Sequence, residues 1–272
     1  MQFTADSFFS PGHRLMRSLV SLTMAALAAL FAAPRTSAQT PSSGSIPIFA
    51  DHVDIGPVGR PGGFVFDPVW RTYTVTGSGV DMWDRNDTMS FVWKQASGDL
   101  SIASDILLVG TSDQPHRKAC LVIRQSLAPD STYVDVAVHG HGLAALQYRE
   151  TTGGITHEIQ SDVAIPLRVR LDKIGDTVYL SVAADGGEPK PSGASIRVAL
   201  KDPFYIGLAA CSHDNANLET VLFRRVEVGA ASPANAAPQP DVRIELLPNG
   251  DRRVVRSDGR ATEALGGLDG IH

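Results

Sequence analysis

The acidic loop at residues 81–87 holds the densest set of side chains that could do chemistry. Asp81, Asp84 and Asp87 lie within seven residues of one another, with Asn86 beside them. Carboxylate and amide oxygens at short spacing suit Ca²⁺, which takes about six to eight oxygen ligands. The spacing is not that of an EF-hand, so a second interpretation stands, in which these side chains hydrogen-bond to their own turn. No cofactor other than this candidate structural Ca²⁺ is indicated.

Aromatic and arginine side chains of the expected sandwich could hold a sugar. Aromatic rings pack against the apolar face of a sugar, while polar side chains bind its hydroxyl groups. The candidate ligand-binding residues are Trp83, Trp70, Tyr73, Tyr148, Arg124 and Arg149. Trp93 lies inside an apolar strand pattern and is assigned to the core. Only 7% of residues are aromatic, so no flat stripe of rings is indicated.

The run His139-Gly140-His141-Gly142 could place two imidazoles on one metal ion. No third ligand is evident near it in the sequence. Two histidines in a Gly-rich junction between strands are also typical of a surface turn, and this is the favoured interpretation.

Catalytic motifs are missing from the sequence. A retaining glycosidase needs two carboxyl groups about 5 Å apart, which on one strand means acidic residues at i and i+2 or i+4. The expected strand 133–139 carries only Asp135, and the expected strand 88–95 carries none. A Gly-x-Ser-x-Gly nucleophile elbow is also missing. We therefore predict that the protein is not an enzyme, with a cryptic glycoside hydrolase or lyase as the less favoured alternative.

The elements that must position these residues are short strands. Met89, Phe91 and Trp93 alternate with other residues at the period of two typical of a β-strand. Similar runs, separated by turn residues, continue to Val228, and no amphipathic helix longer than two turns is indicated. Many short strands at this spacing predict an all-β, two-sheet antiparallel β-sandwich.

The first 38 residues are typical of a secretory signal peptide. Two arginines precede the apolar run 19–33, and small residues lead to a cleavage site after Ala38. The run is shorter than the roughly 20 residues that span a bilayer. We expect a mature chain with no membrane span in the periplasm or outside the cell. Met1 and Met16 are both candidate starts.

The net charge bears on the kind of partner, and the cysteines bear on disulfide formation. The net charge of −5 comes from interspersed charges without a basic patch, which argues against nucleic acid as a partner. The two cysteines, Cys120 and Cys211, could pair after export or could both be small buried residues within strands. The sequence leaves both interpretations open.

Segments from residue 54 to residue 228 match a known domain type in order and spacing. They include YTVTGSG (73–79), DMW (81–83), FVWK (91–94), KACLVIR (118–124), PLRVRL (166–171), YIGLA (205–209) and VLFRRVEV (221–228). On these residues the chain resembles the bacterial DUF1349-type domain, a concanavalin A-like (laminin G-like) jelly roll, over about two thirds of its length. Such domains often precede a TolB-like β-propeller, and NGDRRVV (249–255) is similar to the first hairpin of that propeller.

These observations divide the chain into five segments. They are a signal peptide (1–38), a flexible lead-in (39–48), the concanavalin A-like sandwich (49–228), an Ala/Pro linker (229–241) and a partial hairpin in a short, weakly ordered tail (242–272). We predict an exported, non-catalytic binding or accessory module for carbohydrate or cell-envelope glycan. The alternative is an interaction or scaffold domain of a TolB-like propeller protein, with no small-molecule ligand.

Overall fold

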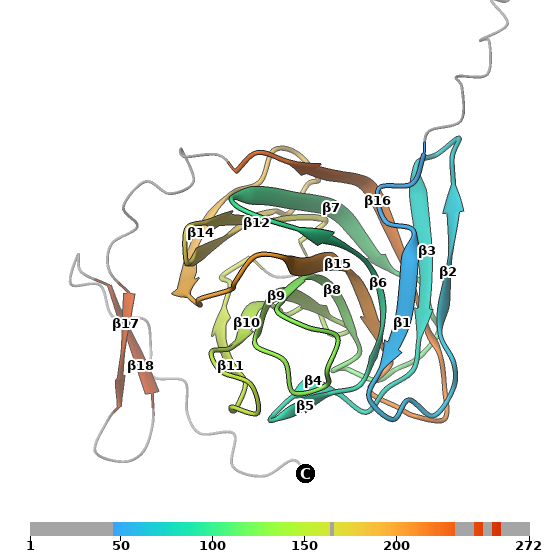
Figure 1. Cartoon of the computed structure of the whole chain (residues 1–272), viewed down its shortest axis with the longest axis horizontal. Helices are drawn as coiled ribbons and strands as arrows, with labels where there is room; N and C mark the ends of the chain where they lie inside the picture. The colour runs from blue at the N-terminus through green and yellow to red at the C-terminus, as the bar shows by residue number, and fades with distance from the viewer. Residues whose placement is uncertain (1–45, 164–165, 232–241, 247–251, 257–272) are drawn as a thin grey trace, which may run out of the picture. The chain divides into compact units, whose positions relative to one another are not determined.

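The computed structural model describes residues 46–163, 166–231, 242–246 and 252–256. Within these ranges the chain forms strands β1 to β18 (Figure 1). The described residues contain no helix of the length and apolarity needed to cross a membrane. The predicted signal peptide and its cleavage site lie outside the described residues.

Seven antiparallel strands form the first large sheet, here called sheet A. Its order is β1 (Asp51–Ile55), β6 (Met89–Ala96), β15 (Phe204–Cys211), β8 (Lys118–Arg124), β9 (Tyr133–His139), β10 (Ala144–Arg149) and β11 (His157–Gln160). Figure 1 shows sheet A curling around a short hairpin. This hairpin consists of β4 (Met82–Trp83) and β5 (Asn86–Asp87), which belong to the acidic loop.

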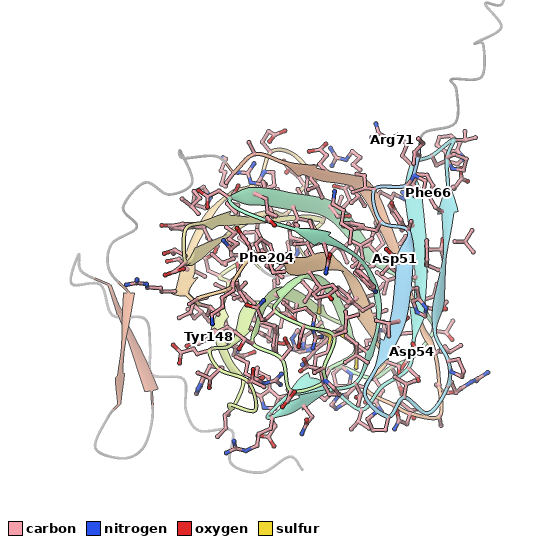
Figure 2. All side chains as sticks on the ribbon, viewed as in Figure 1. Asp51, Asp54, Phe66, Arg71, Tyr148 and Phe204 are labelled. Carbon is pink, nitrogen blue, oxygen red and sulfur yellow. The ribbon has the colours of Figure 1, made fainter. Side chains whose placement is uncertain are left out.

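Seven further antiparallel strands form sheet B. Its order is β14 (Lys190–Arg197), β13 (Thr177–Ala183), β12 (Arg168–Ile174), β7 (Leu100–Leu108), β16 (Glu219–Gly229), β3 (Thr72–Gly77) and β2 (Gly63–Asp67). The main hydrophobic core draws its side chains from both sheets. Phe204 and Tyr148 are buried, whereas Arg71 is exposed at the margin of the molecule (Figure 2).

The alternation of side chains along each strand explains the two layers. On β9, Val134, Val136 and Val138 belong to the main core, while Asp135 and His139 face the opposite side of sheet A. Burying a Val or Leu side chain fully contributes about 1.5–3 kcal/mol, so this apolar stripe fixes which face of each strand turns inward. The predicted all-β, two-sheet antiparallel sandwich is confirmed.

The second face of sheet A is also covered over much of its area. Met82 of the β4–β5 hairpin packs with Met89, Cys120, Val122 and Ala137 in a smaller core. Every residue of β8, β9 and β10 is consequently buried. The hairpin therefore positions the acidic loop and Trp83 directly on sheet A.

The C-terminal strands β17 (Val242–Leu246) and β18 (Arg252–Arg256) pair in antiparallel register, with Ile244 opposite Val254. The predicted Asn-Gly turn at residues 249–250 and the remainder of the predicted tail lie outside the described residues.

Candidate functional site

Two of the predicted ligand-binding arginines form a buried ion-pair cluster with Asp87. The Nη2 atom of Arg149 lies 2.8 Å from Oδ1 of Asp87, and Nη2 of Arg124 lies 3.4 Å from Oδ2. All three side chains are fully buried. Arg149 also donates to the backbone carbonyl of Asp84 at 3.1 Å. These arginines fasten the acidic loop to sheet A and have no exposed surface for a sugar.

The other two carboxylates of the acidic loop point elsewhere. Asp81 accepts hydrogen bonds from Lys118 Nζ and from the backbone N–H of Met82, each at 2.7 Å. Asp84 is exposed and has a φ of 48°. The structure therefore does not bring Asp81, Asp84 and Asp87 together as a shared set of Ca²⁺ ligands. The hydrogen bond within the turn at Asp81 matches the second interpretation of this loop.

Both predicted tyrosines lie in the core between the sheets. Tyr73 is 1% exposed, and its hydroxyl accepts a hydrogen bond from Phe49 N–H at 2.9 Å. Tyr148 is buried with its ring 5.5 Å from the ring of His157. Neither ring is placed to contact a sugar at the surface.

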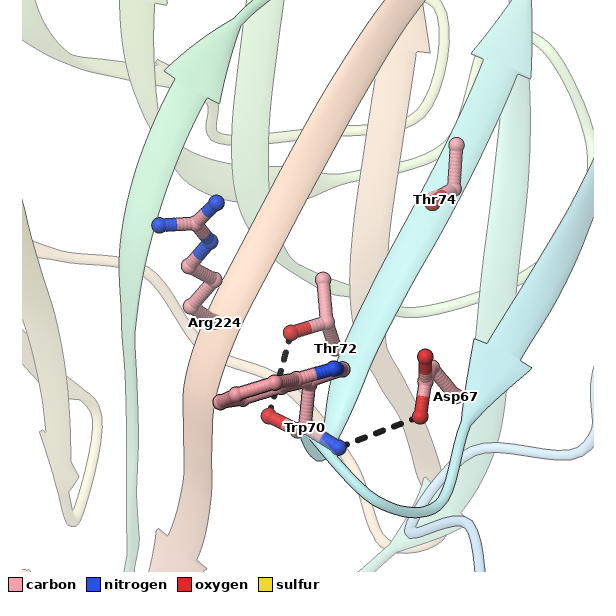
Figure 3. Close-up of a pocket in the computed structure, with 5 residues that line it drawn as sticks. All are labelled: Asp67, Trp70, Thr72, Thr74 and Arg224. Atoms are coloured by element: carbon pink, nitrogen blue, oxygen red, sulfur yellow. Dashed lines mark hydrogen bonds between the residues drawn. The ribbon is translucent and has the colours of Figure 1, made fainter.

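Trp70 lies at the surface, 77% exposed, in the turn between β2 and β3. Its backbone N–H donates to Asp67 Oδ1 at 3.1 Å, and its carbonyl accepts from Thr72 Oγ1 at 3.1 Å. Figure 3 shows the indole beside Thr72, with Thr74 and Arg224 completing a shallow cavity of about 430 Å³. This surface is on the outer face of sheet B.

Trp83 borders a larger cleft on sheet A. The cleft has a volume of about 440 Å³. Trp83 is half-buried, and the ammonium group of Lys118 lies 5.4 Å from the centre of its ring. Burial lowers the pKa of Lys118, but the charge of Asp81 and the hydrogen bond to it together raise that pKa above its ordinary value. Lys118 therefore remains charged beside the indole.

Amide and carboxylate groups of β10 and β11 line another part of the cleft. Gln147 Nε2 donates to Glu158 Oε2 at 3.2 Å. Gln160 Nε2 donates to Glu158 Oε1 at 2.8 Å. Gln147 pairs directly with Glu158 across β10 and β11, so their side chains lie on the same face of sheet A. That face lines the cleft. They offer hydrogen-bond donors and acceptors on the same sheet that carries Trp83.

Four histidines gather at one end of this cleft. The ring centres of His116 and His141 are 5.4 Å apart, those of His139 and His141 are 5.6 Å apart, and His213 lies 5.5 Å from His116. One ligand nitrogen from each of His116, His139 and His141 lies within 4.8 Å of the other two. This is the one such group of at least three metal-ligating side chains within the described ranges.

Close packing of two turns brings these histidines together. The backbone N–H of Gly140 donates to Arg117 O at 2.9 Å, and that of His141 donates to Pro115 O at 3.1 Å. A Cβ atom at Gly140 would lie 2.6 Å from the carbonyl oxygen of Gln114. Only glycine therefore permits this approach without a shift of the backbone.

The protonation of the cluster follows from its surroundings. Burial, together with the charge of Lys118 and the neighbouring imidazoles, lowers the pKa of His139 to about 3. Burial and repulsion by His213 and His141 also lower the pKa of His116. His139 is therefore neutral near pH 7.

Sequence reasoning did not identify His116, His213, Gln147, Glu158 or Gln160. A signal for His116 exists in the strand pairing, because Lys118 of β8 lies opposite His139 of β9. That register places the turn before β8 beside the turn after β9. The two cysteines are free and buried, as one of the two interpretations of the sequence expects.

The scan against protein-family models found no match, and the search of curated proteins found none either. A functionally unknown protein from Saccharomyces cerevisiae has a similar structure, with a TM-score of 0.51 and 13% identity, covering 64% of this chain and 95% of that one. This likeness and the strand order show a two-sheet antiparallel β-sandwich fold.

Two other similar structures have lower scores. One is the carbohydrate-binding module CBM66 from Bacillus subtilis, with a TM-score of 0.43 and 13% identity, covering 67% of this chain and 98% of that one. The other is a Bacillus licheniformis β-glucanase, with a TM-score of 0.42 and 8% identity, covering 62% of this chain and 82% of that one. At such identities the likeness concerns the fold alone.

Proposed function

We propose that the protein is an exported, non-catalytic module that binds carbohydrate in the cleft of sheet A beside Trp83. The observation that carries the proposal is the combination of a half-buried indole with polar side chains in one cleft. The indole offers a surface for the apolar face of a sugar ring. Gln147, Glu158 and Gln160 offer donors and acceptors for its hydroxyl groups.

The state of the carboxyl groups supports binding rather than catalysis. Asp81 is held by Lys118 at 2.7 Å, and Glu158 accepts hydrogen bonds from two glutamine amides. Both carboxyl groups therefore already have donor partners within the protein. A glycosidase needs one carboxyl group that is free to donate a proton to the leaving oxygen.

The biological setting of this proposal rests on the sequence. The predicted signal peptide supports a periplasmic or extracellular location. The resemblance to DUF1349-type domains, which often precede TolB-like propellers, supports an accessory role toward cell-envelope glycan.

A second candidate function is an interaction domain with no small-molecule ligand. The observation that favours it is an exposed apolar surface near the β2–β3 turn. Val65, Val69 and Trp70 are 69%, 79% and 77% exposed. Such patches often mark contacts with other proteins.

A glycan array separates these functions. The chain from residue 39 onward, the predicted mature protein, is compared with Trp83→Ala and with Trp70→Ala, the matched control on sheet B. We expect saccharide binding that falls by about two- to twelvefold in Trp83→Ala, since a stacked ring contributes about 0.5–1.5 kcal/mol beyond its buried area. Binding should be kept in Trp70→Ala. Binding lost only in Trp70→Ala would move the site to the cavity of Figure 3. No binding by the wild-type chain would favour the interaction domain.

A further inference from the structure

We propose that His116, His139 and His141 together bind a divalent transition-metal ion, with Zn²⁺ as the best fit. Imidazole nitrogens are preferred ligands of Zn²⁺ and its neighbours among the late first-row metals. The three residues come from two turns, before β8 and after β9, and from the end of β9 itself. This inference does not depend on carbohydrate binding, although the two sites share one cleft.

The distances between the three ligand nitrogens are slightly longer than those around a bound Zn²⁺ ion. The three ligand nitrogens lie within 4.8 Å of one another. Nitrogens bound to one tetrahedral Zn²⁺ at about 2.0–2.1 Å are about 3.3 Å apart. His116 and His141 are exposed, so rotation of their side chains can supply the remaining movement of up to about 1.5 Å.

The tautomer of His141 is set by a backbone group. Its Nδ1 atom lies 2.6 Å from the carbonyl oxygen of Pro115. A carbonyl oxygen can only accept, so Nδ1 carries the proton and Nε2 keeps a free lone pair. Metal-binding histidines almost always donate the N–H of their second ring nitrogen to a carboxylate, a backbone carbonyl or water.

His139 contributes a buried imidazole in which one ring nitrogen has no hydrogen-bond partner within the described part of the chain. The residue is 4% exposed, and its Nδ1 atom has no hydrogen-bond partner among the described residues. Its Nε2 atom lies 3.5 Å from Nε2 of Gln147. Buried polar nitrogens are rarely left unpaired. The amide nitrogen of Gln147 can only donate, so this contact leaves the ring proton on Nδ1. Ligation through Nδ1 therefore moves that proton to Nε2, whereas ligation through Nε2 replaces the long contact with Gln147.

The charges around the cluster are balanced. Lys118 is paired with Asp81 at 2.7 Å, and Arg117 lies 3.4 Å from Glu219. Neither cation is therefore left uncompensated beside the site. His213 lies next to His116, with its Nδ1 atom 3.7 Å from Asp81. Three protein ligands leave a fourth tetrahedral position, which a water molecule fills in zinc sites of this type.

Calorimetric titration with ZnCl₂ tests the proposal. The chain from residue 39 onward is purified without a polyhistidine tag and stripped with a chelator. We expect one Zn²⁺ per chain. His116→Ala and His141→Ala should each weaken binding by at least roughly 100-fold, because even outer partners of a ligand contribute about 10- to 100-fold. Both side chains are exposed, so these variants should keep the fold. His52→Ala, on β1 at the far edge of sheet A, is the control and should bind like the wild type.

Titration with Co²⁺ gives a readout of the coordination itself. Visible absorption typical of tetrahedral Co²⁺ should appear in the wild type and in His52→Ala, and should be lost in His141→Ala. Absence of saturable Zn²⁺ and Co²⁺ binding by the wild type would overturn the proposal. Unchanged affinity in both His116→Ala and His141→Ala would overturn it as well. Either result leaves the glycan array to be judged separately.

Discussion

Arg149 holds Asp87 through two contacts, Nη2 to Oδ1 at 2.8 Å and Nη1 to Oδ2 at 3.2 Å, in a setting where neither side chain is exposed. The pair joins β10 to the β4–β5 hairpin, so it connects the sandwich to the loop that carries Trp83. A polar contact at this depth is structural, and its removal should affect the fold before it affects any ligand.

Replacing Asp87 by alanine should lower the free energy of unfolding by about 3–5 kcal/mol, because two buried guanidinium groups lose their counter-charge. Denaturant unfolding followed by tryptophan fluorescence measures this change. Asp176→Ala is the matched control, since Asp176 pairs with Arg197 at the surface and should contribute less than about 1 kcal/mol. Equal losses in the two variants would contradict the structural role given to Asp87.

Asp135 should make stability fall as pH rises. Its burial on β9 raises its pKa from 3.8 to about 8, so between about pH 4 and pH 8 the folded chain keeps a proton that the unfolded chain loses. The free energy of unfolding therefore falls across this window, by a few kcal/mol in total. Asp135→Asn cannot lose this proton, so it should be more stable than the wild type at pH 8 and close to it at pH 4.

Thermal unfolding of both proteins at several pH values measures this difference. The lowered pKa of His139 acts in the opposite direction, since its stabilising effect is lost as pH falls from about 6.5 toward 3. That effect is present in both proteins and largely cancels in their difference. A difference between wild type and Asp135→Asn that is the same at pH 4 and pH 8 would show that folding does not raise the pKa of Asp135.

Gly140→Ala should disturb the histidine cluster without removing a ligand. The added Cβ would meet Gln114 O at 2.6 Å, so the two turns must separate, and the overlap should cost about 1–3 kcal/mol. Zn²⁺ affinity should fall as well, as measured by calorimetry. Gly63→Ala is the control, because a Cβ there meets no atom within 4 Å. Wild-type stability in Gly140→Ala would mean that the turns are not packed this closely.

Calcium should leave thermal stability unchanged, because Asp81 and Asp87 are already bound to cationic side chains. A site filled at 100 times its Kd would add about 2.7 kcal/mol and raise Tm by several degrees. Calorimetric scans with Ca²⁺ and with a chelator measure the difference. A calcium-dependent rise in Tm that disappears in Asp84→Asn would restore the Ca²⁺ interpretation of the acidic loop.

The fold could be predicted from the sequence because each strand is determined by a local pattern, the alternation of its side chains. The alternation of Met89, Phe91 and Trp93 indicates a strand, and in the structure these three side chains share the face of β6 that packs in the smaller core. Similar patterns recur along the chain. The site could be predicted only in part. Trp83 does border a cleft, whereas Arg124 and Arg149 were selected by residue type and lie fully buried. Their burial depends on how the β4–β5 hairpin packs on sheet A.

The histidine cluster could not be predicted from the sequence for a different reason. His116 and His139 are 23 residues apart in the sequence, and their proximity depends on the register in which β8 pairs with β9. That register is fixed by apolar packing on both faces of the sheet and by the turn at Gly140. A one-residue slip would break the pairing of Lys118 with His139, which places the two turns side by side.

The burial of β8, β9 and β10 on both faces has a consequence for how this protein can change. Substitutions within those strands must preserve the packing of two cores at once. Most of the described side chains that line the cleft instead lie in turns or near strand ends, where Trp83, His116, His141 and His213 all lie. Selection can therefore alter what the cleft recognises by exchanging turn residues, while the sandwich beneath it stays the same.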